Sequence, residues 1–323
     1  MKAIIYTKYG PPDVLQLKEV EKPAPKDNEV LVKVHAASVN PLDWHFMRGE
    51  PFLVRLMVGG LLKPKKKILG ADIAGRVEAV GRNVKQFQPG DEVFGGNGVG
   101  GFAEYVCLTE DSLALKPANI SFEEAAAVPV AALTALQGLR DYGQIQPEQK
   151  VLINGAGGGV GTFAVQIAKS FEAQVTGVCS TMKLDMVRSI GADQVIDYTG
   201  EDFTRNRQRY DLILDAAAYR SISDYKRALS PRGIYVLVGG SMALMFRVML
   251  VGPWLSMTGS KKMRTVMAKI NKKDLALMKE LLEAGKVIPV IDRRYSLSEV
   301  PEAIKYLEEG HAQGKVVITV QGQ

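Results

Sequence analysis

The residues best suited to chemistry in this sequence form a glycine-rich turn between an apolar stretch at residues 151–154 and a helical pattern at residues 162–169. Ala156, Gly158 and Gly161 occupy the three positions where small residues keep such a turn tight, let the backbone approach a pyrophosphate, and let the helix pack closely on its strand. The free N–H groups at the start of the helix would then face the phosphates. The order of strand, turn and helix therefore predicts a dinucleotide site, although glycine-rich turns also join strands to helices without a ligand.

The second strand of this predicted unit, at residues 173–178, ends without the acid that would bind the ribose 2′-hydroxyl of NAD. Ser180 and Lys183 stand there instead. A hydroxyl can donate a hydrogen bond to a 2′-phosphate and an ammonium group can balance its charge, whereas a carboxylate would repel it. We therefore expect NADPH to be preferred over NADH. The alternative is that Lys183 is a solvated residue in the first turn of the next helix.

The composition is that of a globular protein with more than one domain. The chain has 323 residues, 46% hydrophobic and 24% charged, which is too long for one compact core. Lysine and arginine exceed aspartate and glutamate by 6 (41 − 35), an excess too small and too dispersed for a nucleic-acid face. The densest basic run, Lys63-Pro-Lys-Lys-Lys67, is more typical of a solvated loop than of a phosphate or anionic-lipid contact. We expect no nucleic-acid partner.

The two cysteines and the first residues bear on location. Cys107 and Cys179 lie far apart in sequence and imply no disulfide framework, so a reducing compartment is the simpler expectation. The apolar stretch at residues 3–6 is broken too early for a signal peptide. We therefore expect a cytoplasmic protein.

The pattern of secondary structure changes twice along the chain. Short strands separated by turns are expected at 2–6, 29–37, 72–80, 92–94 and 103–108. Ser121 and Glu124 form a capping box that starts a helical stretch. Strands then alternate with helices, at 151–154, 174–178, 194–196, 212–215 and 234–238, which predicts a doubly wound parallel sheet. A final set resembles a return to the first pattern, with a helix at 274–284, a strand near 288–293, a helix at 298–309 and a strand at 315–320.

The fold class is therefore α/β, with one domain inserted into another. We expect residues 1–122 and 268–323 to form a split β-rich catalytic or substrate domain, and residues 123–267 to form the Rossmann domain that binds the dinucleotide.

Several long motifs in order resemble the medium-chain dehydrogenase/reductase superfamily, and in particular its zinc-independent quinone oxidoreductase branch. They lie at residues 69–81, 89–93, 127–136, 154–161 and 314–318. The pairing of residues 40–44 (NPLDW) with Arg48-Gly49 is similar to the chloroplast-envelope quinone oxidoreductase homologues and to bacterial 2-alkenal reductases. The resemblance implies a GroES-like fold for the β-rich domain.

Unlike the zinc-dependent members of this superfamily, the chain lacks the side-chain ligands that a zinc ion needs. Asn40 stands where the first catalytic cysteine would be, and Gly70-Ala71-Asp72 replaces the Gly-His-Glu that supplies the histidine. The loop at residues 95–101 carries no cysteine for a structural zinc. A set made of Asp43, His45 and Asp72 would be a poor one for zinc, because it offers two carboxylates and a single imidazole, with no sulfur. We expect no zinc.

Without a Lewis acid, a conjugated acceptor is the expected substrate class. Hydride transfer to an α,β-unsaturated carbonyl or a quinone leaves a delocalised anion that hydrogen-bond donors can stabilise. Asn40 is the first candidate for such a donor, with Trp44 as the opposite wall of the cleft and water as the proton source. The alternative for Asn40 is a turn residue before Pro41. Asp43 is expected to pair with a cation such as Arg48 rather than to act in catalysis.

The resemblance implies further cofactor contacts, several of them at strand ends, where open α/β sheets bind ligands. These residues are Asn40, Thr134, Gly159, Val160, Tyr198, Ala216, Val238, Gly239 and Gly240. For Thr134 and Tyr198 ordinary packing is an equal alternative.

A methionine-rich apolar segment at residues 241–267 is the least ordinary stretch. It could form a pliable lid over a hydrophobic substrate, since methionine adapts to irregular shapes, or a subunit interface. A third reading makes it part of a peripheral membrane contact, together with residues 52–57 and 63–67.

The expected function is NADPH-dependent, zinc-independent reduction of quinones or activated C=C bonds by a homodimer or higher homo-oligomer. Two alternatives remain open: reduction of an enoyl thioester, and an NADPH-binding regulatory or RNA-binding protein with little turnover.

Overall fold

The computed structural model describes residues 1–57, 60–240, 248 and 260–320, and it separates into two compact units. Unit 1 comprises Met1–Val130, Ile270–Ala284 and Pro289–Gln323, and unit 2 comprises Ala131–Lys269 and Gly285–Ile288. The first change of unit thus falls after Val130, eight residues beyond the boundary expected from the sequence. The reason is that helix α3 (Phe122–Ala126) packs on β3 and β4 of unit 1.

Unit 1 is built around a seven-stranded sheet in the order β14-β15-β3-β4-β5-β7, with β6 paired to β3. A separate hairpin joins β1 to β2. The strands are β1 (Lys2–Ile5), β2 (Gln16–Glu19), β3 (Glu29–Val39), β4 (Asp72–Val80), β5 (Glu92–Gly96), β6 (Tyr105–Thr109), β7 (Leu113–Leu115), β14 (Ile291–Ser296) and β15 (Lys315–Thr319). The pairing of β15 with β3, Val316 opposite Val39, brings the end of the chain to its first third.

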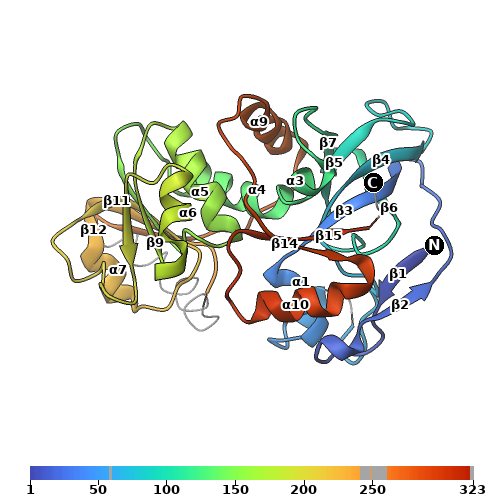
Figure 1. The fold of residues 1–323 in the computed structure, drawn as a ribbon, viewed down its shortest axis with the longest axis horizontal. Coiled ribbons are helices and arrows are strands. Elements are labelled where there is room, and N and C mark those ends of the chain that lie inside the picture. The colour runs from blue at the N-terminus through green and yellow to red at the C-terminus, as the bar shows by residue number, and fades with distance from the viewer. Residues whose placement is uncertain (58–59, 241–247, 249–259, 321–323) are drawn as a thin grey trace. The chain divides into compact units, whose positions relative to one another are not determined.

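Helices flank this sheet. They are α1 (Pro41–Arg48), α2 (Val54–Met57), α3, the start of α4 (Pro129–Gln137), α9 (Lys272–Glu283) and α10 (Val300–Glu308), with short 3-10 turns at Pro12–Val14, Glu110–Ser112 and Leu297–Glu299. Figure 1 shows α1 and α10 side by side, and the ion pair from Arg48 to Glu308 joins them. The core beneath them is aliphatic and aromatic, with Tyr6, Met47 and Phe102 fully buried.

Helix α1 was not among the expected elements, yet its boundaries follow local rules. Asn40 is the residue before the helix, Pro41 takes the first helical position, and Gly49 ends the helix in the left-handed conformation with φ 64°. Proline at the start and glycine just past the end are the favoured arrangement, because proline needs no hydrogen bond there and glycine accepts positive φ. The backbone of Asn40 is therefore the N-cap of a helix that begins at Pro41.

Unit 2 is a six-stranded sheet in the order β10-β9-β8-β11-β12-β13, with every neighbouring pair parallel. This confirms the predicted doubly wound sheet. The order is the one that places a dinucleotide at the ends of the neighbouring strands β8 and β11, the first and fourth strands of the unit in chain order. Its elements are the rest of α4, a π-helical turn (Gly138–Tyr142), β8 (Lys150–Asn154), α5 (Gly159–Ser170), β9 (Gln174–Cys179), a 3-10 turn (Thr181–Lys183), α6 (Leu184–Ser189), β10 (Gln194–Asp197), β11 (Tyr210–Asp215), α7 (Ile222–Ala228), β12 (Leu229–Leu237) and β13 (Lys262–Thr265).

The hydrophobic pattern explains this sheet. In β8, residues Val151, Leu152 and Ile153 are all fully buried, as expected for a strand covered on both faces. Helices α5 and α6 lie beside β9, as Figure 1 shows. The methionine-rich segment lies largely outside the described residues, apart from Val248, which is buried, and residues 260–267. Within the described part of the chain, no helix combines the length and apolar character needed to cross a bilayer.

Candidate functional site

The glycine turn predicted to bind a dinucleotide joins β8 to α5. The N–H groups of Gly155 and Ala156 both donate to Val178 O on β9, at 3.1 and 3.0 Å, which holds the turn against the neighbouring strand. Gly158 is the N-cap of α5, and its carbonyl accepts the first helical hydrogen bond from Thr162 N at 2.9 Å. By helix geometry, the first-turn N–H groups, those of Gly159 and Val160 among them, have no partner within the helix. They are the donors that could bind a pyrophosphate.

Glycine is required at this turn because backbone and side chains crowd it. An ideal Cβ at Gly161 would lie 2.0 Å from Gly155 O and 2.7 Å from Ala156 Cα, so any side chain would force α5 away from β8. A Cβ at Gly157 would lie 2.6 Å from Lys183 Cδ, which shows that the Lys183 side chain lies across the turn. The cradle therefore has the form that a dinucleotide phosphate needs, with a cationic side chain beside it.

Ser180 and Lys183, predicted for the 2′-phosphate, and Tyr198, predicted as a further cofactor contact, gather at the ends of β9 and β10, which pair side by side. Ser180 directly follows β9, and its carbonyl accepts a hydrogen bond from Lys183 N at 2.9 Å. Tyr198 directly follows β10, donates its N–H to Cys179 O, and is 47% exposed. Its ring lies near that of Tyr219, with centroids 6.4 Å apart and the planes tilted.

An acid also lies at this corner, and the sequence reading missed it. Asp197 ends β10, and its carboxylate accepts hydrogen bonds from the hydroxyl of Thr181 and from the N–H and hydroxyl of Thr199. These bonds, the one from Thr181 first, hold the pKa of Asp197 below its usual range. The sequence motif places such an acid at the end of the second strand, β9, whereas Asp197 ends the third, β10. The parallel pairing of β9 with β10 is what brings this carboxylate close to Ser180.

The ends of β11 and β12 carry three more of the predicted cofactor contacts, Ala216, Val238 and Gly239. Ala216 N donates to Asn154 O at 3.0 Å, and Val238 N and Gly239 N donate to Asp215 O at 2.9 and 3.2 Å. The Asp215 carboxylate is buried and accepts from Asn154 Nδ2 at 2.7 Å and from Tyr235 OH at 2.8 Å. Burial raises the pKa of Asp215, and these donors counter the shift. The structure thus brings Ala216, Val238 and Gly239 together at the carboxyl ends of the strands.

Two further predicted cofactor residues belong to unit 2. Gly240 pairs with Ala218 in an isolated bridge and has φ 122°, which only glycine adopts readily. Thr134 lies half-buried on α4.

In unit 1, a buried polar network surrounds Asn40. Its Nδ2 donates to Asp72 Oδ2 at 2.9 Å and to Ser38 O at 3.4 Å, and its Oδ1 accepts from Lys315 Nζ at 2.7 Å. Only 3% of Asn40 is exposed. Both amide hydrogens are therefore engaged inside the unit, and a bond from Asn40 to a substrate oxygen would require one of them to be released.

Lys315 was absent from the sequence prediction, although it is the buried cation of this network. Its Nζ also lies 3.3 Å from Val39 O and 3.5 Å from Asp72 Oδ2. Asp72 in turn accepts from Ser38 Oγ and from Val130 N at the start of α4. Desolvation lowers the pKa of Lys315, whereas the carboxylate of Asp72 opposes that shift.

Asp43, a neighbour of this network, does not pair with Arg48, so that expectation is wrong. Arg48 binds Glu308 through Nε and Nη2, whereas Asp43 accepts from the N–H groups of Asn40 and Gly70 at 2.8 and 3.0 Å. The physical reason is burial: Asp43 is fully buried at the first turn of α1, and Arg48 lies one and a half turns further on, toward α10. Desolvation raises the pKa of Asp43 to about 7, and the two backbone donors limit that rise.

This pKa predicts a pH-dependent stability. The folded-state pKa of Asp43, about 7, exceeds its ordinary value of 3.8, so its stabilising contribution is complete below pH 3.8 and is lost as pH rises through 7. Between those values the free energy of unfolding of the wild type should fall relative to Asp43→Asn by about 1 kcal/mol per pH unit. Urea unfolding of both proteins at several pH values measures this. Parallel curves would show that Asp43 is ionised throughout.

Trp44, the predicted wall of the substrate cleft, is half-buried on α1. Its ring lies against His45 with centroids 3.6 Å apart and packs on the core of unit 1. Asn40 and Trp44 thus belong to unit 1, and the predicted dinucleotide contacts apart from Asn40 belong to unit 2.

The residues around Asn40 do not fit a zinc ion. The two positions that correspond to ligands in zinc-dependent dehydrogenases hold Asn40 and Ala71, which offer neither sulfur nor imidazole. The carboxylate of Asp72 is satisfied by Ser38, Asn40, Val130 and the Lys315 ammonium group. Across the described residues, no cluster of three or more His, Cys, Asp or Glu side chains has the arrangement to hold a metal.

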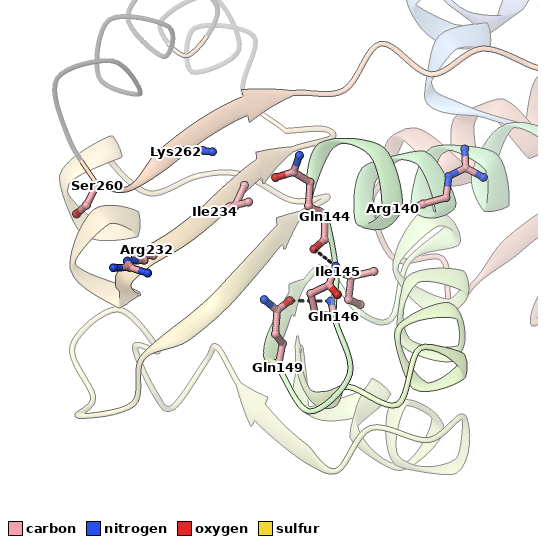
Figure 2. Close-up of a pocket in the computed structure, with 9 residues that line it drawn as sticks. All are labelled: Arg140, Gln144, Ile145, Gln146, Gln149, Arg232, Ile234, Ser260 and Lys262. Atoms are coloured by element: carbon pink, nitrogen blue, oxygen red, sulfur yellow. Dashed lines mark hydrogen bonds between the residues drawn. The ribbon is translucent and has the colours of Figure 1, made fainter.

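A cavity of about 850 Å³ in unit 2 lies away from this chemistry (Figure 2). Its lining comes from Gln144, Gln146 and Gln149 on the loop that enters β8, and from Arg232 and Lys262 near the amino ends of β12 and β13. Dinucleotides bind at the carboxyl ends of such strands. We therefore place the candidate site at the glycine turn, not at this cavity.

A β-rich unit and a unit with this parallel sheet and glycine turn are the two parts expected of a two-domain dehydrogenase, and comparison with known proteins identifies the family. Residues 26–118 match the alcohol dehydrogenase GroES-like domain, and residues 190–318 match a family described as zinc-binding dehydrogenase. A chloroplastic quinone-oxidoreductase, QR1, of Triphysaria versicolor is 35% identical over 98% of both chains. A 2-methylene-furan-3-one reductase of Solanum lycopersicum is 37% identical over 98% of this chain and 79% of its own.

A solved structure extends the comparison to the fold. The Escherichia coli quinone oxidoreductase complexed with NADPH has a TM-score of 0.83, with 26% identity, and the match covers 99% of this chain and 100% of that one. The chain therefore belongs to the medium-chain dehydrogenase/reductase superfamily of oxidoreductases, in its quinone oxidoreductase branch. The predicted GroES-like and Rossmann folds are confirmed.

Proposed function

We propose that the protein is an NADPH-dependent, zinc-independent reductase of quinones or of the activated C=C bond of α,β-unsaturated carbonyls. The observation that carries the proposal is the glycine cradle of unit 2 with Lys183 lying across it and Ser180 and Tyr198 at the adjacent strand ends. The names of two relatives, one a quinone oxidoreductase and one an enone reductase, support the same substrate classes.

The chain's own residues would bind and orient the dinucleotide. The first-turn N–H groups of α5 would hold the pyrophosphate, and the hydroxyl of Ser180 and the ammonium group of Lys183 would bind the 2′-phosphate. Ala216, Val238 and Gly239 would contact the dinucleotide from the ends of β11 and β12. When bound, NADPH supplies a hydride.

A conjugated acceptor suits a site without a metal. The negative charge that develops on a quinone or enone is delocalised, so hydrogen-bond donors can stabilise it where an unactivated alkoxide would need a Lewis acid. We propose that Asn40 acts in one of two ways. Its side chain could release the hydrogen bond to Ser38 O, which at 3.4 Å is the longest of the three that the side chain makes, and donate to the substrate oxygen. Alternatively, Asn40 positions Trp44 on α1. Water would supply the proton.

Consumption of NADPH with a panel of enones, quinones and enoyl thioesters tests this function. Turnover of enones or quinones supports it, whereas turnover confined to enoyl thioesters identifies an acyl-thioester reductase. NADPH binding without any turnover would favour a regulatory or RNA-binding protein.

Replacing Lys183 tests the coenzyme preference. Lys183→Ala should weaken NADPH binding about tenfold, because a charge-assisted hydrogen bond contributes about 1.5 kcal/mol or more, and should leave NADH binding nearly unchanged. Isothermal titration with both coenzymes measures this. Lys150→Ala, which removes an exposed lysine at the opposite end of β8, is the control. A change below about threefold would remove Lys183 from the 2′-phosphate site, and a preference for NADH in the wild type would point to Asp197 as the ribose ligand.

Metal removal tests the zinc-independent part. Treatment with a chelator should leave turnover unchanged, because the charged group beside Asn40 and Asp72 is the ammonium of Lys315. Turnover is measured before treatment, after it, and after addition of zinc. Activity that the chelator abolishes and zinc restores would contradict the proposal.

We infer a homodimer or higher homo-oligomer in the cytoplasm. The methionine-rich segment at residues 241–267, for which the sequence leaves a lid and a subunit interface open, lies mostly outside the described residues. Of that segment, the described residues include Met263, buried in β13, and Met267, which is 64% exposed.

A further inference from the structure

An apolar and basic segment follows α1 in unit 1. We define it as residues 52–57 and 60–67, and call it the apolar–basic segment. Five large apolar side chains in it are exposed: Phe52 59%, Leu53 57%, Leu56 60%, Leu61 47% and Leu62 90%. These are five of the twelve exposed large hydrophobic residues among all described positions, so they form a concentration rather than a scatter. Concentrated exposed apolar surface marks a binding face.

The segment is held in place, so this exposure is not that of a frayed loop. Gly60 N donates to Arg55 O at 3.0 Å, and the Tyr9 hydroxyl donates to Gly60 O. The Arg55 guanidinium donates to Gly49 O at 3.1 Å and to Leu61 O at 3.2 Å. It also lies over the rings of Tyr9 and Phe52. The backbone is therefore tied to α1 and to the N-terminal strand region while the apolar side chains stay exposed.

The charge of the segment is entirely positive. Residues 51–67 contain no Asp or Glu, and they contain Arg55 and four lysines at positions 63, 65, 66 and 67. All four lysines are exposed. Within the described residues none of the four makes an ion pair, whereas the Arg55 guanidinium donates hydrogen bonds to Gly49 O and Leu61 O. Their charge remains available to an external anionic surface.

We propose that the apolar–basic segment docks the protein peripherally on an anionic lipid surface. Apolar side chains next to a lysine cluster match an acyl–headgroup boundary, because the former can enter the interface while the latter contact lipid phosphates. Nucleic acid would leave five exposed apolar side chains without a partner. A second copy of the chain would place these lysines against like charge unless it offered an acidic face. Charge complementarity thus favours the lipid.

Sedimentation with vesicles tests the proposal on the full chain. Vesicles of phosphatidylglycerol and phosphatidylcholine in equal parts should bind the wild type, and vesicles of phosphatidylcholine alone should not. Binding should weaken at high salt, because salt screens the lysine contacts. The double variant Lys65→Glu/Lys66→Glu should bind at least about tenfold more weakly, and Leu62→Ser should also lose binding.

Matched controls separate the segment from overall charge and hydrophobicity. Lys272→Glu/Lys273→Glu makes the same change in net charge at two exposed lysines of α9, and Ile288→Ser removes an apolar side chain that is 60% exposed. Both should bind like the wild type. These measurements do not depend on turnover, so a failed activity panel would leave them intact.

Three results would overturn the proposal. The first is equal binding to both kinds of vesicle. The second is equal loss in the control variants. The third is absence of vesicle binding by the wild type. In that case, a change in oligomeric state of Leu62→Ser in sedimentation velocity would assign the surface to a subunit interface, and a change in its KM for substrate would assign the surface to the substrate cleft.

Discussion

Gly161→Ala is expected to lose NADPH affinity by more than about tenfold and to lower the free energy of unfolding by about 3 kcal/mol. The added methyl group would meet Gly155 O at 2.0 Å and Ala156 Cα at 2.7 Å. Both are backbone atoms, so no side-chain rotation relieves the clash. Helix α5 must move away from β8, and its first-turn N–H groups move with it.

Isothermal titration with NADPH and urea unfolding measure the two effects. Gly200→Ala is the matched control, since a Cβ at Gly200 has no neighbour within 4 Å. It should change neither quantity. If Gly161→Ala folded and bound NADPH with the affinity of the wild type, the cradle would not be the coenzyme site. If its free energy of unfolding also equalled that of the wild type, the tight packing of α5 on β8 would be wrong.

The glycine cradle could be predicted from the sequence because everything that specifies it is local. An apolar strand, small residues at fixed spacing and a helical pattern lie within twenty residues, and the parallel sheet follows from alternation repeated several times. The capping box of Ser121 and Glu124 is confirmed for the same reason, with Glu124 N donating to Ser121 Oγ at 3.1 Å. The bounds of helix α1 could also have been predicted from the sequence, because Asn40-Pro41 precedes its first turn and Gly49 follows its last.

The network around Asn40 could not be predicted in this way. Lys315 and Asn40 are 275 positions apart, and they meet only because β15 pairs with β3. Arg48 finds Glu308 across 260 positions for a similar reason, since α10 packs on α1. When neither pairing is known, Arg48 is expected to bind the nearest acid, Asp43, and the Asn40 amide is expected to be free for substrate. Asp197 was missed because its nearness to Ser180 depends on β9 pairing with β10.

Lys315→Met is expected to lower the free energy of unfolding by about 4 kcal/mol, because it leaves the Asp72 carboxylate buried without its cation. Methionine keeps most of the volume, so a cavity contributes little. Asn40 Oδ1 and Val39 O would also lose the hydrogen bonds that they accept from Lys315 Nζ. Urea unfolding measures the change.

A double-mutant cycle with Asp72→Asn separates charge from packing. If the unpaired carboxylate causes the loss, Lys315→Met/Asp72→Asn should regain about half of it, because neither charge is then buried alone. Lys279→Met is the control: it breaks an exposed helical ion pair with Glu283 and should cost less than about 1 kcal/mol. A Lys315→Met variant as stable as this control would mean that the ammonium group is not the partner of Asp72. In that case the reason for excluding a metal beside Asn40 would fail as well.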